Sequence, residues 1–312
     1  MSTDKHGLRL RAAWVAAALL YLMCTAQSAA GQETRVVTDQ TGRTVPVPVR
    51  IGRVVSLAPN VTEILYALGV EDRLVGVTQQ CNFPPAAAAK PKVGDTLNPS
   101  LEILISLQPD LVIGTAEGNR RETIDLLERA GIPLYGTHAR TVADIFASIR
   151  ELASLMGVPE AGERLASELE ERLEALEHRL AGAARPRVLV AIWLDPLITA
   201  GGDTFMNDVL RRAGAESVTA SLSESWPRLS LEAVIESDPD YLVLPRLHSL
   251  QARLDDLRAR PAWRHVRAVE NGRIVWLDEA LLRPGPRIVG AMEDLARALH
   301  PERFSQSEAA RQ

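Results

Sequence analysis

The residues best suited to bind a ligand lie in short polar segments that follow runs of strand-forming residues. Three such segments are 58–60 (Ala-Pro-Asn), 78–82 (Thr-Gln-Gln-Cys-Asn) and 115–119 (Thr-Ala-Glu-Gly-Asn), and a fourth is 193–196 (Trp-Leu-Asp-Pro). Amides and hydroxyls can hydrogen-bond polar groups of a ligand, while Trp and Pro offer apolar contact. Open α/β sheets bind ligands outside the carboxyl ends of their strands, so these segments are expected to converge on one cleft. The candidate ligand-binding residues in these four segments are Pro59, Asn60, Gln80, Asn82, Thr115 and Trp193.

The second half of the chain adds an aromatic and several charged side chains to this set. Trp226 lies in a polar loop before an expected helix, which makes it the tryptophan best placed to face a ligand. Asp278 and Arg283 follow in a segment rich in charge and proline, with Arg287 close behind. Together with Arg246, these arginines could bind an anionic ligand, although solvated arginines are common. Core packing remains the alternative for each tryptophan.

Motifs of catalysis and nucleotide binding are absent from the sequence. There is no P-loop, no G-x-S-x-G and no H-E-x-x-H, and Gly201-Gly202 lacks the third glycine of a dinucleotide site. No two histidines have helical ligand spacing, so a metal site would have to combine distant residues such as His138 and His248. The sequence therefore favours a binding protein over an enzyme, without a catalytic residue, cofactor or metal. A net charge of −5 also gives no support for nucleic-acid binding.

The first thirty residues have the features of an export signal. A basic region is followed by the apolar run 12–23 and then by the small residues of 28–30. The apolar run is shorter than the roughly 20 residues that a transmembrane helix needs, although an uncleaved membrane anchor is the alternative. We therefore predict a signal peptide over 1–30, export, and cleavage near Ala30.

The two cysteines do not form a disulfide framework. A lipid anchor at Cys24 is disfavoured because Met23 precedes it, where a small residue is normally needed. Cleavage of 1–30 leaves Cys81 as the remaining cysteine, so no internal disulfide can form. No histidine or basic residue lies beside Cys81 in sequence, which favours a packed thiol at a loop over a reactive one.

Strands and helices alternate on both sides of a helical middle, which predicts parallel α/β sheets in two lobes. The expected N-terminal lobe is 31–140, with a hairpin over 34–50 and strands over 53–58, 74–78, 111–114 and 133–137. The expected C-terminal lobe is 184–304, with strands over 187–193, 241–245 and 273–278, helices over 204–214 and 287–300, and a tail over 305–312. With 312 residues, 46% of them hydrophobic, the chain can bury a core in each lobe.

The middle segment, 141–183, is expected to be two helices, 141–157 and 159–183. In the second helix, leucines recur at a spacing of three or four residues: Leu165, Leu169, Leu173, Leu176 and Leu180. This helix would be about 37 Å long at 1.5 Å per residue, enough to bridge two lobes. The alternative is a coiled coil that makes the chain a dimer with a structural or signalling role, but the stripe covers few heptads.

One short unit occurs twice in the chain, 130 positions apart. Residues 100–113 read SLEILISLQPDLVI and residues 230–243 read SLEAVIESDPDYLV. In each copy a serine is expected to cap a helix, and Pro-Asp then leads into a strand. A capped helix in each lobe explains most of the repeat, but it does not explain the glutamate at the same step, Glu102 and Glu232.

Several stretches resemble the cobalamin-type periplasmic binding proteins of ABC importers, within the wider group that carries haem and ferric siderophores. They are RVVSLAPNVTEILYALG, GVTQQCNFPP, KVGDTLNPSLEILISLQPDLVI, SWPRLSLEAVI and LRPGPRIVGAMEDLARAL, and the resemblance runs in order over nearly all of 34–304. It implies two α/β lobes bridged by a rigid helix, with the ligand between the lobes. It also implies docking on a membrane permease through Glu102 and Glu232, and we expect the protein to be a monomer.

The resemblance implies a corrinoid ligand, with cobalamin expected and with haem or a ferric siderophore as the alternative. Cobalamin-type members line the cleft with several aromatics, whereas Gln80, Thr96 and Thr115 stand at such places here. Pro59, Trp226, Asp278 and Arg283 are retained. Each docking glutamate also has a local explanation, since an acidic residue near a helix N-terminus is stabilising by about 0.3–1 kcal/mol.

Overall fold

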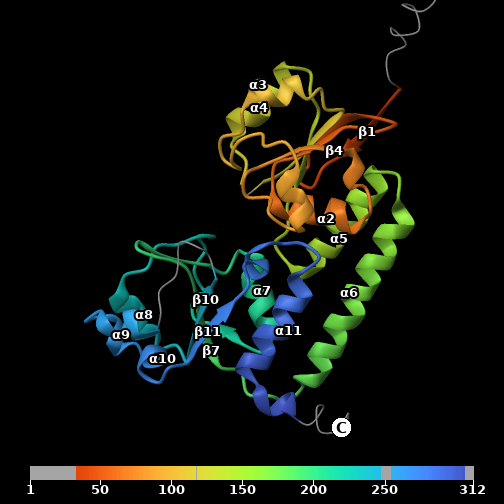
Figure 1. The fold of residues 1–312 in the computed structure, drawn as a ribbon. Coiled ribbons are helices and arrows are strands. Elements are labelled where there is room, and N and C mark those ends of the chain that lie inside the picture. The colour runs from red at the N-terminus through yellow and green to blue at the C-terminus, as the bar shows by residue number, and fades with distance from the viewer. Residues whose placement is uncertain (1–32, 117, 247–253, 306–312) are drawn as a thin grey trace, which may run out of the picture.

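A computed structural model describes residues 33–116, 118–246 and 254–305, and it shows two α/β lobes joined by two long helices (Figure 1). The expected fold class is confirmed. The predicted export signal, His248 and nearly all of the expected tail lie outside the described residues. Across the described ranges, no helix has both the length and the apolar character needed to cross a membrane.

The N-terminal lobe consists of a hairpin and a parallel sheet in the order β4-β3-β5-β6. The hairpin pairs β1 (Thr34–Thr38) with β2 (Thr44–Pro48), and the sheet contains β3 (Val54–Ser56), β4 (Leu74–Val77), β5 (Leu111–Thr115) and β6 (Leu134–Thr137). Its helices are α2 (Pro59–Ala67), α3 (Leu101–Ser106) and α4 (Arg121–Arg129), with short 3₁₀ turns η1 (Glu71–Arg73) and η2 (Pro85–Ala89). Its strands are mostly buried because helices cover both faces, as is usual for a parallel sheet.

Helices α5 (Val142–Leu155) and α6 (Pro159–Arg179) connect the lobes, and α6 runs along one side of the molecule (Figure 1). Thr141 and Asp144 form a reciprocal capping box at the start of α5. Helix α6 ends four residues before the expected position 183. Gly182 there has a φ of +70°, which is the left-handed conformation typical of helix ends.

The leucine stripe of α6 packs inside the molecule. Leu169, Leu173, Leu176 and Leu180 are all buried, and Leu165 is half-buried against the same core. A coiled-coil dimer needs this stripe at the surface, facing a second helix. The structure therefore argues against the dimerisation helix that the sequence left open.

The C-terminal lobe has the sheet order β11-β10-β7-β8, with β9 also pairing with β7. Its strands are β7 (Arg187–Leu194), β8 (Leu197–Thr199), β9 (Glu216–Ser217), β10 (Tyr241–Pro245) and β11 (Ile274–Leu277). Its helices are α7 (Phe205–Arg212), α8 (Leu231–Ser237), α9 (Leu254–Ala259), α10 (Arg267–Glu270) and α11 (Ile288–Leu299). The 3₁₀ turns are η3 (Trp263–His265), η4 (Glu279–Leu282) and η5 (Pro301–Arg303). The sequence did not predict β8, β9, α9 or α10.

One hydrophobic core runs through both lobes without interruption. It contains Val61 and Ile64 of α2, Ile149 of α5, Leu173 of α6 and Met292 of α11, all buried in a single cluster. Smaller clusters fill the outer side of each sheet. Because close-packed interiors resist shear, this shared core holds the two lobes in a nearly fixed relative orientation.

Polar contacts add to this packing where the helices meet the C-terminal lobe. Arg172 of α6 binds Glu293 of α11 at 2.9 Å, and the backbone N–H of Val142 donates to Asp208 of α7 at 3.0 Å. Burial alone would raise the pKa of Asp208, but hydrogen bonds from Val142, Arg212 and Arg211 lower it. Exposed ion pairs contribute only about 0–1 kcal/mol each, so packing stabilises the junction more than charge does.

The closest approach of α5 and α6 depends on Gly162, and we expect Gly162→Ala to destabilise the fold by about 1–3 kcal/mol. A Cβ there would overlap the Cβ of Ala153 and lie 3.2 Å from the carbonyl oxygen of Ile149. Urea unfolding measures the effect. The matched control is Gly290→Ala in α11, where the nearest atom to a new Cβ is 3.7 Å away. Gly290→Ala should raise the free energy of unfolding by about 0.5–1 kcal/mol, because alanine is more favourable than glycine in a helix. Equal effects of the two variants would contradict the packing argument.

Candidate ligand-binding cleft

A cavity of about 380 Å³ lies between the lobes at the carboxyl ends of the strands. The N-terminal lobe contributes Ala58, Pro59, Asn60, Gln80, Thr96, Thr115 and Gly118, and the C-terminal lobe contributes Phe205, Trp226, Glu279, Leu282, Arg283 and Pro284. Larger hollows of about 650 and 740 Å³ each lie on a single lobe. The inter-lobe cavity is the candidate site because ligands of open α/β sheets bind at this end of the strands.

On the N-terminal side, the segments that follow β4 and β5 are tied together by hydrogen bonds. Asn119 accepts from the backbone N–H of Thr115 at 2.8 Å and donates to the carbonyl oxygen of Thr96 at 2.7 Å. Thr96 in turn donates to the side chain of Gln80 at 3.4 Å. A Cβ at Gly118 would lie only 2.9 Å from Thr96, so glycine permits this close contact. These bonds hold the polar groups of the wall in place.

On the C-terminal side, the loop that carries Trp226 lies directly on the segment after β8. The backbone N–H of Gly201 donates to the carbonyl oxygen of Ser225 at 2.9 Å, and that of Gly202 donates to Leu222 at 2.9 Å. A Cβ at either glycine would overlap a backbone carbonyl of the Trp226 loop. The Gly-Gly pair therefore positions an aromatic side chain at the cleft.

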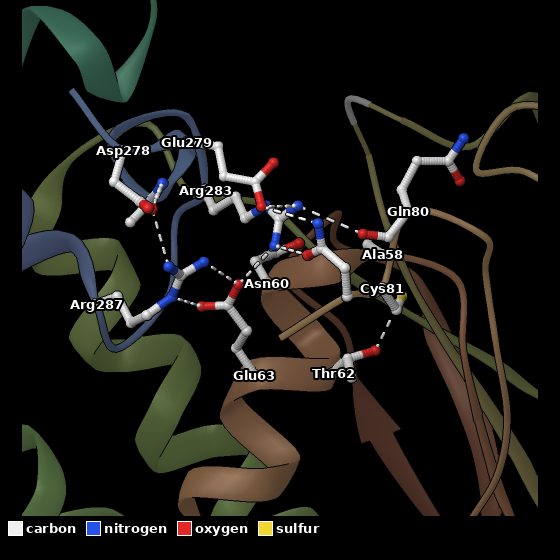
Figure 2. Close-up of polar contacts among 12 residues, drawn as sticks. Ala58, Asn60, Thr62, Glu63, Gln80, Cys81, Asp278, Glu279, Arg283 and Arg287 are labelled. Atoms are coloured by element: carbon white, nitrogen blue, oxygen red, sulfur yellow. Dashed lines mark hydrogen bonds and ion pairs between the residues drawn. The ribbon is translucent and has the colours of Figure 1, made fainter. Parts of the chain in front are cut away.

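A buried carboxylate joins the lobes beside this cavity (Figure 2). Glu63 of α2, with a side chain only 2% exposed, accepts from Arg283 at 2.9 Å. It also accepts two hydrogen bonds from Arg287, at 2.8 and 2.9 Å, in the bidentate geometry that favours Arg–carboxylate pairs. We call Glu63, Arg283 and Arg287 the inter-lobe triad.

A second ring of polar groups surrounds the inter-lobe triad. Arg283 binds Glu279 at 2.9 Å and the side-chain oxygen of Asn82 at 2.8 Å, and Asn82 donates to Glu279 at 3.0 Å. Arg287 binds Asp278 at 2.9 Å and lies 4.0 Å from the centre of the Phe83 ring. The pKa of Arg287 is raised, mainly by its hydrogen bonds to Glu63, although burial acts in the opposite direction.

This arrangement leaves neither arginine of the triad free for an anionic ligand. Arg283 and Arg287 face three carboxylates, those of Glu63, Asp278 and Glu279, so the cluster is not cationic. Arg246 lines the hollow along β11 and does not line the inter-lobe cavity. The possibility that these three arginines bind an anion is therefore not supported.

Most of the residues predicted to bind ligand do line the cavity: Pro59, Asn60, Gln80, Thr96, Thr115, Trp226 and Arg283. Asn82 and Asp278 instead contact the inter-lobe triad. Trp193 does not line the cavity, contrary to expectation. Residues 193–196 do not form a loop between a strand and a helix, because β7 turns back into β8 and Trp193 pairs with Ile198 in this hairpin. The indole N–H of Trp193 donates to the carbonyl oxygen of Asp195 at 2.8 Å.

Sequence reasoning missed Glu63, Phe205 and Leu282. Glu63 carried a signal, because it is the one charged residue in the otherwise apolar or uncharged helix α2. An ionised residue in such a helix needs a partner, and two arginines spaced i,i+4 stand near the C-terminus of the chain. Phe205 and Leu282 line the cavity as parts of α7 and η4, and no distinct pattern in the sequence marks either of them.

Cys81 is a packed thiol, as its sequence context favoured. It is 1% exposed and lies 3.1 Å from the hydroxyl oxygens of both Thr62 and Thr78. Among the described residues, no group of three or more His, Cys, Asp and Glu side chains could hold a metal ion.

The repeated unit forms two equivalent capped helices, α3 and α8, one in each lobe. The Ser100 hydroxyl accepts from the N–H of Ile103 at 3.4 Å, and the Ser230 hydroxyl accepts from the N–H of Ala233 at 3.2 Å. Glu102 and Glu232 are both exposed. The pKa of Glu232 is lowered by a hydrogen bond from its own backbone N–H and by one from Ser230. Both helices lie on the side of the molecule away from α6 (Figure 1).

Comparison with known proteins matches residues 54–281, most of the chain, to the periplasmic binding protein family. The chain belongs to this family. The vitamin B12-binding protein of Vibrio parahaemolyticus is 31% identical over 244 residues, covering 78% of this chain and 87% of the relative. An uncharacterised ABC transporter substrate-binding lipoprotein of Bacillus subtilis is 29% identical over 291 residues, covering 89% of this chain and 91% of the relative.

Solved structures share the fold of this periplasmic binding protein. A periplasmic heme-binding protein of Roseiflexus is 31% identical with a TM-score of 0.73, and the match covers 80% of this chain and 98% of the Roseiflexus chain. The periplasmic vitamin B12-binding protein of Vibrio cholerae is 27% identical with a TM-score of 0.71, and the match covers 80% of this chain and 96% of the Vibrio cholerae chain. The chain is thus a solute-binding protein with a small-molecule ligand, it acts outside the cytoplasm, and its family is not a class of enzymes.

Proposed function

We propose that this binding protein captures a corrinoid, with cobalamin as the expected ligand, and delivers it to an ABC permease in the membrane. In this proposal the chain is exported to the periplasm after loss of residues 1–30, without a lipid anchor, and acts as a monomer without a cofactor. Relatives named as vitamin B12-binding proteins support the ligand, and the burial of the α6 leucine stripe supports the monomer.

The observation that carries the choice of ligand is the chemistry of the cavity wall. Haem iron in proteins is held by His, Cys, Met or Tyr, and none of these is among the described residues that line the cavity. Cobalamin carries both axial ligands of its cobalt, so it needs no such side chain. The wall therefore suits a tetrapyrrole whose metal is already coordinated.

The remaining wall groups suit the flat face and the amide-bearing rim of a corrinoid. Trp226, Pro59 and Leu282 provide apolar and aromatic contact for the macrocycle. Gln80 and Asn60 have side-chain amides that can pair with amides of the ligand. A corrinoid is larger than a cavity of about 380 Å³, so part of the ligand would remain in solvent.

Calorimetric titration of the mature protein with cobalamin, cobinamide and haemin tests this function. We expect one cobalamin per chain, and binding at least tenfold weaker, about 1.4 kcal/mol, in Trp226→Ala. Trp193→Ala is the matched control and should bind as the wild type does, because Trp193 does not line the cavity. Binding of haemin without cobalamin would overturn the proposal.

Haem is the second candidate, because several solved neighbours are named as heme-binding proteins. Absorbance spectra after mixing with haemin distinguish the two ligands, since an axial protein ligand shifts the haem bands. A ferric siderophore fits less well, because the arginines near the cavity are paired with carboxylates.

A further inference from the structure

Exposed isoleucines mark the two helices of the repeated unit. Ile105 in α3 is 48% exposed and Ile235 in α8 is 39% exposed. They occupy the same step of the repeat, 130 positions apart, and each lies three residues after a docking glutamate. On a helix, side chains at i and i+3 are neighbours, about 5–6 Å apart at Cβ. Each lobe therefore presents a carboxylate beside an apolar side chain.

The same two features determine which face of α3 and of α8 points to solvent. Each begins at a serine cap, and each completely buries the residue directly before its isoleucine, which is Leu104 in α3 and Val234 in α8. With both helices fixed by cap and core, Glu102 and Ile105 face solvent in one lobe as Glu232 and Ile235 do in the other. The local geometry is thus duplicated, and not the sequence pattern alone.

Helix stability does not explain these isoleucines. Single exposed apolar residues are common at protein surfaces. However, a β-branched residue is less favourable in a helix than Ala, Leu, Lys or Glu, so an exposed isoleucine gains nothing locally. The two helices differ at other exposed steps, where Ile103 and Ser106 correspond to Ala233 and Glu236. Both helices nevertheless have isoleucine three residues after the glutamate.

We propose that Ile105 and Ile235 are apolar anchors of a two-point dock, each inserted beside the ion pair made by its neighbouring glutamate. The partner is the outer face of the permease, which presents in each of two places a Lys or Arg next to an apolar recess. This inference rests on the proposed delivery to a permease and adds the apolar half of the recognition. Apolar anchors prolong the complex, while exposed charges speed its formation.

Surface plasmon resonance with the cobalamin-import permease–ATPase complex of the same organism, held in lipid nanodiscs, tests this dock. The variants are Ile105→Ala, Ile235→Ala and the double variant, and alanine preserves the helices. We expect dissociation to be roughly five- to tenfold faster for each single variant and about fiftyfold faster for the double, with association and its salt dependence unchanged. Val36→Ala is the control, because Val36 is 69% exposed on β1, across the lobe from α3 (Figure 1).

The outcomes separate this inference from the function on which it rests. Glu102→Ala and Glu232→Ala should instead slow association and weaken its dependence on salt, because screening acts on charge. If the isoleucine variants dissociate from the permease as the wild type does while the glutamate variants associate more slowly, the apolar anchors are disproved and delivery to the permease stands. If the wild type does not bind the permease although it binds cobalamin, delivery is disproved and the anchors with it.

Discussion

Replacement of Glu63 by alanine is expected to lower the free energy of unfolding by about 3–5 kcal/mol. The carboxylate is almost fully buried, and its loss leaves Arg283 and Arg287, 11% and 23% exposed, without their shared partner between the lobes. Removing one partner of a buried ion pair leaves charge that is neither hydrated nor compensated. Urea unfolding should show the loss, together with a fall in melting temperature on the order of 10 °C for a chain of this size.

Glu293→Ala provides the matched control for that prediction. Glu293 also binds one arginine through two oxygens and also joins two elements, but it is 30% exposed and its partner Arg172 is 41% exposed. Its loss should cost at most about 1 kcal/mol, as is typical of surface pairs. If Glu63→Ala costs no more than Glu293→Ala, water compensates the triad and the lobes are held by packing alone.

The inter-lobe triad also links stability to ligand binding. Arg283 both binds Glu63 and lines the cavity, so a change at Glu63 alters the wall that a ligand would contact. Glu63→Gln keeps the shape of the side chain and removes its charge. We expect it to retain the fold better than Glu63→Ala and still to bind cobalamin more weakly than the wild type.

Loss of both docking glutamates should abolish transport while leaving ligand affinity unchanged. Glu102 and Glu232 lie on α3 and α8, and neither lines the cavity. The double variant Glu102→Ala/Glu232→Ala should therefore bind cobalamin as the wild type does. Uptake of cobalamin into proteoliposomes that contain the permease complex should fall to the level seen without any binding protein.

A second double variant makes this transport experiment specific. Glu171→Ala/Glu174→Ala removes two exposed charges from α6, on the far side of the molecule from α3 and α8 (Figure 1). This variant changes the net charge by the same amount as Glu102→Ala/Glu232→Ala does, and it should leave cobalamin uptake unchanged. Normal uptake by the Glu102/Glu232 double variant would show that the carboxylates only stabilise their helix N-termini.

The continuous core explains why the permease would have to open the cleft. Two lobes with separate cores can rotate about a flexible hinge, whereas here buried residues run unbroken from α2 through α5 and α6 to α11. The inter-lobe triad adds a further contact between the lobes beside the cavity. We therefore expect that ligand release needs force applied to both lobes, which two docks on separate lobes can supply.

Features that depend on local pattern could be predicted from the amino-acid sequence. Alternation of strand and helix signals predicted two α/β lobes, and Ser100 and Ser230 predicted two capped helices. Strand-end loops predicted most of the cavity wall, including Pro59 and Gln80. These predictions succeeded because periodicity, capping and the position of binding loops are set by neighbours along the chain.

Contacts between groups far apart in the sequence could not be predicted in this way. Glu63 and Arg283 are 220 positions apart, and no local pattern pairs them, yet together they occupy the boundary between the lobes. The return of β7 into β8 took Trp193 out of the expected cavity wall, although its residue type and position suited a ligand. The leucine stripe of α6 fitted a dimer seam equally well until packing buried it. Such outcomes depend on which surfaces the folded chain brings into contact, because burial and charge pairing act through space and not along the sequence.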